Sequence, residues 1–199
     1  MRKVKKIIGV MGLVVLTVGL VLAAGQGESK YDSGTTAAEV NFKPYIGKQI
    51  VKAVYATTDK AGGTVKIYAS NGVKVAPTTA PTNGATVIAV SNASYSLTNG
   101  DHVVYVHLDG TLDKTTVSTA TTSNVTLAAA ITVAGATGDY LYELTQQAQL
   151  DFDTSGAGVG TNKYGKFESD AVFITPSDSP IYVVADGTSN CVVNVAVER

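Results

Sequence analysis

Short runs of β-branched and aromatic residues recur from residue 46 onward and predict a succession of β-strands. Residues 49–57 (QIVKAVYAT) form a run that is too short and too rich in valine for a helix. Turn-forming glycine, asparagine, aspartate and proline separate this run from the next ones. The predicted strands are residues 49–57, 64–69, 73–76, 85–90, 103–108, 111–118, 124–127, 139–144, 171–174, 181–185 and 191–197.

Two of the turns carry the sequence signal of a tight hairpin. Asn71-Gly72 lies between the second and third predicted strands, and Asp109-Gly110 lies between the fifth and sixth. Both central residues of a type I′ turn need positive φ, which asparagine, aspartate and glycine tolerate. The second turn would pair Leu108 with Thr111.

The strand pattern predicts an all-β protein: an antiparallel β-sandwich or jelly-roll-like domain over residues 41–199. A helix is a weaker alternative for residues 142–150, where Thr145 and two glutamines interrupt the apolar pattern. No exact internal repeat occurs in the sequence, which argues against a solenoid or a propeller.

The first 40 residues follow a different pattern. Residues 1–6 (MRKVKK) are basic, and residues 7–24 are apolar and uncharged, which is the pattern of a secretory signal peptide. If residues 1–24 are retained instead, eighteen apolar residues are long enough for a membrane anchor, and residues 7–24 would then contact a membrane. Residues 25–40 carry few apolar side chains and predict a flexible arm that could reach a neighbouring subunit.

Charge limits the classes of partner. Asp, Glu, Lys and Arg make up 16% of the 199 residues, and four of the 15 basic residues lie between Arg2 and Lys6. The rest of the chain is therefore acidic and offers no basic patch for nucleic acid. A neutral surface rich in hydroxyl and amide groups is typical of exported and virion proteins.

The residues that could carry chemistry do not form a complete catalytic or metal-binding motif. His102 and His107 are five apart in one predicted strand, so they should face opposite sides of the sheet and cannot share a metal. The single cysteine, Cys191, lies in a predicted strand, where a buried thiol acts as a small hydrophobic side chain.

Three loop motifs are equally incomplete. Residues 151–156 (DFDTSG) resemble the opening of a calcium loop, but Asn162 stands where the closing carboxylate is needed. Gly156, Gly158 and Gly160 lack the following helix of a phosphate-binding loop. Asn92 and Asn124 begin glycosylation sequons. We therefore name no catalytic, cofactor-binding or metal-ligating residue, and we expect no enzyme activity and no cofactor.

Two stretches resemble small β modules of tailed-phage virion proteins. In these modules a Gly-Asp pair, a strand, a turn, a threonine-rich strand, a second Gly-Asp pair and a tyrosine follow one another. The same order occurs here from residues 99–105 (NGDHVVY) through residues 126–127 to residues 138–142 (GDYLY). The second stretch is residues 179–188 (SPIYVVADGT). The resemblance implies a capsid decoration or coat-associated protein without catalytic residues. The N-terminal leader departs from this pattern, because decoration proteins ordinarily lack one, and it fits an exported cell-surface protein, or a virion with a membrane, better.

The expected function is that of a structural subunit in a repeating surface assembly. It would be extracellular, on a cell surface or on a virion surface, and it would self-assemble as a homo-oligomer or pack on a capsid or other surface shell. The alternative is a secreted carbohydrate- or surface-binding module.

Overall fold

The computed structural model describes residues 27–60, 62–91, 97–151, 163–188 and 191–199, with the backbone alone for residues 163–172. In this part of the chain the elements are all strands: β1 (Gly27–Gly34), β2 (Ala37–Phe42), β3 (Ile50–Thr58), β4 (Thr64–Ala69), β5 (Lys74–Val75), β6 (Val87–Ala89), β7 (His102–Val106), β8 (Leu112–Ala120), β9 (Asn124–Leu127), β10 (Tyr140–Asp151), β11 (Lys163–Ile174), β12 (Ile181–Asp186) and β13 (Cys191–Glu198).

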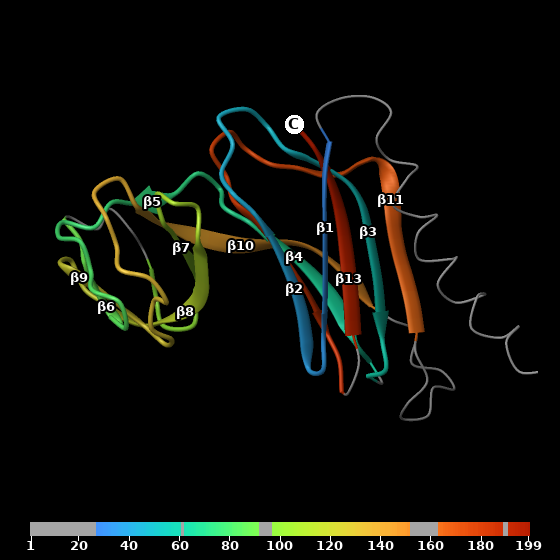
Figure 1. Cartoon of the computed structure of the whole chain (residues 1–199), viewed down its shortest axis with the longest axis horizontal. Helices are drawn as coiled ribbons and strands as arrows, with labels where there is room; N and C mark the ends of the chain where they lie inside the picture. The colour runs from blue at the N-terminus through green and yellow to red at the C-terminus, as the bar shows by residue number, and fades with distance from the viewer. Residues whose placement is uncertain (1–26, 61, 92–96, 152–162, 189–190) are drawn as a thin grey trace, which may run out of the picture.

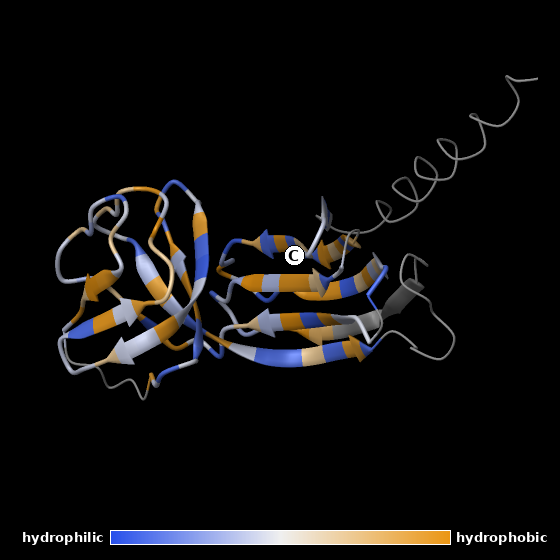
Figure 2. Cartoon of the chain, turned by 90° about the horizontal axis from the view of Figure 1, so that it is seen from below, coloured by the Kyte–Doolittle hydropathy of each residue, from blue (hydrophilic) through white to orange (hydrophobic). Residues whose placement is uncertain are grey.

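These strands form two antiparallel sheets, as the sequence predicted (Figure 1). The smaller sheet has the order β1-β13-β3-β11, and the larger has the order β2-β12-β4-β10-β7-β8-β9-β6, with β5 also on β10. Hydrophobic and hydrophilic residues alternate along the strands (Figure 2), so one face of each sheet is apolar and can be buried.

The long strand β10 belongs to two parts of the molecule. Its second half, from Thr145, pairs with β4, and its first half pairs with β5 and β7. We call the facing sheets around β4 the sandwich, and the strongly curled part formed by β5 to β9 the curled lobe. Figure 1 shows β10 running from one to the other.

Each part has its own buried core. The sandwich core lies between the sheets and includes Phe42, Val54, Ile67, Val183 and Val195. The curled lobe closes around Tyr105, Ile88, Ile131 and Leu141, among others. A third cluster, built from Tyr68, Val104, Tyr142, Leu144 and Tyr182, lies on the outer face of the large sheet where the two parts meet.

Residues 27–40 do not form the flexible arm that the sequence predicted. They form β1 and most of β2, so the predicted domain boundary at residue 41 falls inside a strand. β1 pairs with β13 over eight positions without an irregularity. Its residues alternate between exposed and half-buried, and none is fully buried, which explains why it lacks an apolar pattern. Residues 1–24 lie outside the described residues. None of the described elements is a helix that could span a membrane.

The Asn71-Gly72 hairpin prediction was wrong. β4 and β5 do not pair with each other; both run antiparallel to β10, β4 beside residues 145–151 and β5 beside residues 141–142. Gly72 has a φ of 92°, and this positive φ allows the chain to bend between β4 and β5 while it continues in the same direction along β10. The helical alternative for residues 142–150 was also wrong, because β10 covers them.

The Asp109-Gly110 hairpin is confirmed, but its register differs. The Gly110 amide donates to the His107 carbonyl over 2.8 Å, and the His107 amide donates to the Thr111 carbonyl over 2.9 Å. His107 and Thr111 therefore flank a three-residue loop, with Gly110 at a φ of 89°. This is the type I turn followed by a left-handed residue that is common in three-residue hairpins.

Candidate functional site

The two histidines lie at opposite ends of β7 and in different surroundings. His102 is half-buried and packs on Tyr68, with 4.8 Å between the ring centroids. Burial is the largest cause that lowers the pKa of His102, and the nearby ammonium groups of Lys114 and Lys66 lower it further. His107 follows β7 and is buried. The two histidines therefore lie in separate surroundings.

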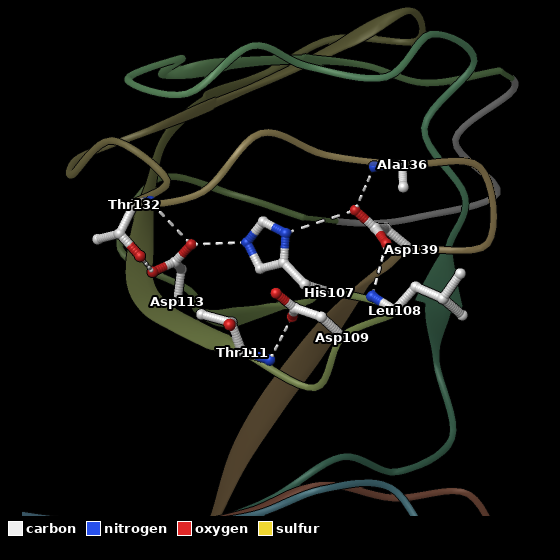
Figure 3. Close-up of polar contacts among 8 residues, drawn as sticks. All are labelled: His107, Leu108, Asp109, Thr111, Asp113, Thr132, Ala136 and Asp139. Carbon is white, nitrogen blue, oxygen red and sulfur yellow. Dashed lines mark hydrogen bonds and ion pairs between the residues drawn. The ribbon is translucent and has the colours of Figure 1, made fainter.

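His107 is held between two acidic side chains (Figure 3). Its Nε2 lies 2.8 Å from an Asp113 carboxylate oxygen, at hydrogen-bond distance. Its Nδ1 lies 3.5 Å from an Asp139 carboxylate oxygen, within ion-pair distance but without a hydrogen bond. All three side chains are at least nine-tenths buried. Buried charged groups are tolerated where they are paired and hydrogen-bonded, so this cluster is built as a unit.

Both carboxylates also hold backbone groups. Asp139 accepts hydrogen bonds from the amides of Leu108 and Ala136, each over 2.7 Å. Asp113 accepts from the amide and the hydroxyl of Thr132 over 2.9 and 2.6 Å. The cluster therefore fastens the β7–β8 turn to the segment that leads into β10.

The geometry of this cluster suits a structural role better than a metal site. The imidazole stands between the two carboxylates, so the three groups do not converge on one point where a cation could sit. Elsewhere in the described residues, too, no group of three or more histidine, cysteine or acidic side chains could hold a metal.

Sequence reasoning missed this cluster because of the turn register. Pairing Leu108 with Thr111 would have put His107 and Asp113 on opposite faces of the hairpin. In the structure Tyr105 pairs with Asp113, so His107 is a diagonal neighbour of Asp113 on the same face. If the Asp109-Gly110 turn had been assigned a three-residue loop, the sequence would have predicted His107 and Asp113 on the same face of the hairpin.

A cleft of about 290 Å³ lies between the sandwich and the curled lobe. Its walls come from β2 and β12 on one side, and from β7, β8 and residues 127–132 on the other. β2 and β8 are far apart in the sheet order, and they line one cleft because the large sheet curls strongly. The polar side chains that line the cleft include those of Glu39, Asn41, Lys114 and Tyr182.

Lys114 is the cation of the cleft. Its Nζ lies 4.4 Å from the ring centroid of Tyr182 and 5.5 Å from that of Tyr68, distances at which the ring faces attract a cation. It makes no ion pair with any residue that the structure describes. Burial is the main cause that lowers the pKa of Lys114, and Glu39 partly opposes this shift.

Two buried polar atoms near Lys114 have no hydrogen-bond partner of standard geometry. They are the Tyr182 hydroxyl and His102 Nδ1. Burial is the largest cause that raises the pKa of Tyr182, and the facing carboxylate of Glu39 raises it further. The Tyr182 hydroxyl at the cleft therefore interacts with Glu39, although not at standard hydrogen-bond geometry.

The remaining sequence candidates form no site in the described residues. Cys191 is buried, as predicted, with its Sγ 3.4 Å from the Gly34 carbonyl oxygen. Asn124 is exposed at the start of β9. Asp151 ends β10, whereas residues 152–156 of the calcium-like motif, the three glycines at 156, 158 and 160, and Asn92 lie outside the described residues.

Comparison with known proteins adds no family. No protein-family model and no curated protein matches this chain. Among solved structures, the infectious bursal disease virus Gx strain is 12% identical over 88% of this chain and 38% of that chain, with a TM-score of 0.14. The VP2 subviral particle of infectious bursal disease virus is 11% identical over 87% of this chain and 37% of that chain, with a TM-score of 0.13.

The present chain thus spans less than two fifths of the chains it matches. At such TM-scores the likeness carries no argument about fold or function. The resemblance to tailed-phage virion modules stays a prediction.

Proposed function

We propose that this protein is a non-enzymatic structural subunit of a repeating assembly at a virion or cell surface. The observation that carries the proposal is the outer edge of β1. β1 is the last strand of its sheet, and no described strand pairs with its outer edge. Such an edge presents a row of unpaired backbone donors and acceptors, to which a strand of another chain can add.

The other sheet edges are less suited to pairing. Side chains of β1 cover part of the β2 edge: Asp32 accepts from the Glu39 amide over 2.8 Å, and the Lys30 ammonium donates to the Asn41 carbonyl over 2.7 Å. β11 has an irregular register between Glu168 and Phe173, and β6 is only three residues long. Bulges and short strands are common means of blocking edge pairing.

Electron microscopy and native mass spectrometry of the purified chain test this proposal. We expect ordered particles, sheets or filaments, or discrete oligomers that grow with concentration. A chain that stays monomeric from micromolar to millimolar concentration, at neutral pH and physiological salt, would rule the proposal out. Antibody labelling of intact virions or cells would then place the protein at the surface or elsewhere.

A second candidate function, binding of a carbohydrate, is favoured by the cleft. Glu39, Asn41 and Lys114 offer an acceptor, an amide and a donor, and the buried Tyr182 hydroxyl lies beside them, facing Glu39. A few polar groups around an apolar surface are the usual make-up of a small-ligand site. Saccharide hydroxyls could hydrogen-bond to all four.

Titration of mono- and oligosaccharides into the ¹⁵N-labelled chain, followed by NMR, tests this second candidate. We expect shifts at the amides of Asn41, Lys114 and Thr132 that are lost in Asn41→Ala and Lys114→Met. Lys43→Met, whose lysine lies near Asp109 and away from the cleft lining, is the matched control. No shift with any saccharide would exclude this function.

A further inference from the structure

β1 carries an exposed tyrosine and an ordered set of charged side chains beside its unpaired outer edge. Tyr31, at the centre of the strand, is 62% exposed, although large aromatic side chains are usually buried or placed at interfaces. Ser29 and Ser33 share its exposed face, and Lys30 and Asp32 lie on the opposite, half-buried face. The strand is polar throughout, yet it runs eight residues without a bulge.

Charges on an edge strand usually oppose pairing with another chain. Lys30 and Asp32 already contact β2, and Lys30 also lies 3.4 Å from Glu28 of its own strand. The order of these charges nevertheless matches one partner, a second copy of the same strand. In an antiparallel pair centred on Tyr31, each Lys30 stands opposite Asp32 of the second copy. Each Ser29 stands opposite Ser33 of the second copy, and the two tyrosines face each other.

Shifting this register by one residue destroys the match. If Lys30 were opposite Tyr31 of the second copy, Ser29 would face Asp32 and Glu28 would face Ser33, and no opposite charges would be paired. Opposite charges and aromatic pairs placed directly across from each other stabilise a sheet, whereas like charges destabilise it. The antiparallel register of Glu28 to Gly34 (ESKYDSG) centred on Ser29 also pairs opposite charges, Lys30 with Glu28, but it puts Tyr31 opposite Gly27. The register centred on Tyr31 is favoured because it pairs Lys30 with Asp32 and the two tyrosines at the same time.

We infer that two copies of this protein pair β1 against β1 in antiparallel fashion, with the two-fold axis at Tyr31. The inference rests on the proposed assembly function and deepens it by naming the repeating unit. The two four-stranded sheets then join into one continuous sheet, in which β1 of each copy lies at the centre. A two-fold contact closes on itself, so the repeating unit is a dimer, and a second, different surface extends the assembly.

Single-cysteine cross-linking in the full chain tests the register. In Tyr31→Cys the two new thiols stand directly opposite, where the Cβ–Cβ distance of about 4.5–5.5 Å in facing pairs approaches that of a disulfide. In Ser29→Cys the two thiols are offset by four residues along the strands, roughly 13 Å. The native Cys191 is buried and does not compete.

We expect Tyr31→Cys to form a covalent dimer at least about tenfold faster than Ser29→Cys under copper-phenanthroline oxidation, because held thiols have a much higher effective concentration. A mixture of Ser29→Cys and Ser33→Cys chains should also cross-link, since those positions face each other between copies. Equal rates for Tyr31→Cys and Ser29→Cys would overturn the inference.

A second variant keeps the inference separate from the proposed function. Tyr31→Asp puts two carboxylates face to face across the axis without changing a buried residue, so the dimer should dissociate while circular dichroism stays unchanged. Ile46→Asp, at a position 91% exposed outside β1, is the control that keeps the dimer. If the wild-type chain forms particles and Tyr31→Asp leaves them intact, the β1 pairing fails and the assembly function stands. If the wild-type chain forms no oligomer, both fail.

Discussion

Lys114 and Lys74 have the same side chain but opposite effects on folding. Burial is the main cause that lowers the pKa of Lys114, so the fold disfavours its charge. For Lys74, burial acts in the same direction, but the hydrogen bond to Asp178, the charge of Asp178 and the interaction with Tyr142 outweigh it and raise the pKa. Lys74 also lies 4.3 Å from the ring centroid of Tyr140.

We therefore predict opposite changes in stability for the same substitution. Lys114→Met should raise the free energy of unfolding at pH 7, and Lys74→Met should lower it, each by no more than about 1 kcal/mol because solvent screens both charges. A lysine whose folded pKa is lowered destabilises only while it is charged. The gain in Lys114→Met should thus shrink as pH rises toward 10.5, the ordinary pKa of lysine. Urea titrations at pH 7 and pH 10 measure this; equal signs for the two variants would contradict it.

Gly110 is a residue whose backbone conformation decides the turn. At a φ of 89°, a Cβ atom costs about 1 kcal/mol, so Gly110→Ala should lower the melting temperature by about 2–4 °C. Gly27→Ala is the control: its Cβ would meet only the Val197 carbonyl oxygen, at an ordinary 3.7 Å. Equal melting temperatures for the two variants would show that the turn adopts another conformation in solution.

At the scale of elements, β1 and β2 differ in what they contribute to the fold. β2 puts Ala38, Val40 and Phe42 into the sandwich core. β1 contributes no fully buried side chain and is held by its backbone pairing with β13 and by polar contacts such as Arg199 with Glu28, 2.6 Å apart. The sandwich core therefore needs β2 for its stability but does not need β1.

We predict that removal of residues 1–34 leaves a cooperatively folding protein, whereas removal of residues 1–42 does not. The longer truncation deletes the three β2 core residues, and loss of a buried phenylalanine alone costs about 3–5 kcal/mol. Urea unfolding followed by circular dichroism distinguishes the two. If the shorter truncation is already unfolded, the β1 ladder is essential to the fold rather than an edge available for assembly.

The elements that could be predicted from sequence are those with an apolar alternation of their own. β3, β4, β12 and β13 show it, and their strand assignment is confirmed. β1 could not be predicted, because its inward residues are Glu28, Lys30 and Asp32, and only the tertiary position beside β13 makes it a strand. The cleft could not be predicted either, since it depends on the curl of the large sheet, which brings β2 and β8 together.

At the scale of the whole molecule, two cores are joined by one continuous strand. The sandwich and the curled lobe have separate buried clusters, which by themselves would allow two independent unfolding transitions. β10 crosses from one to the other, and the cluster of Tyr68, Val104, Tyr142, Leu144 and Tyr182 fills the junction. Opening the curled lobe alone would expose this cluster to water, at a cost of about 25 cal/mol per Å² of apolar surface.

We therefore predict a single calorimetric transition for the wild-type chain, with equal calorimetric and van't Hoff enthalpies. Tyr142→Ala removes a side chain that is 2% exposed at the junction, together with its 3.2 Å hydrogen bond from the hydroxyl to Asp178. This variant should split the transition in two, because the lobes then lose their shared cluster while each keeps its own core. Ile67→Val, inside the sandwich core, costs about 0.5–1.5 kcal/mol and should only lower the single transition. Two transitions in the wild type would mean that β10 does not couple the lobes, and that one lobe unfolds while the other stays folded.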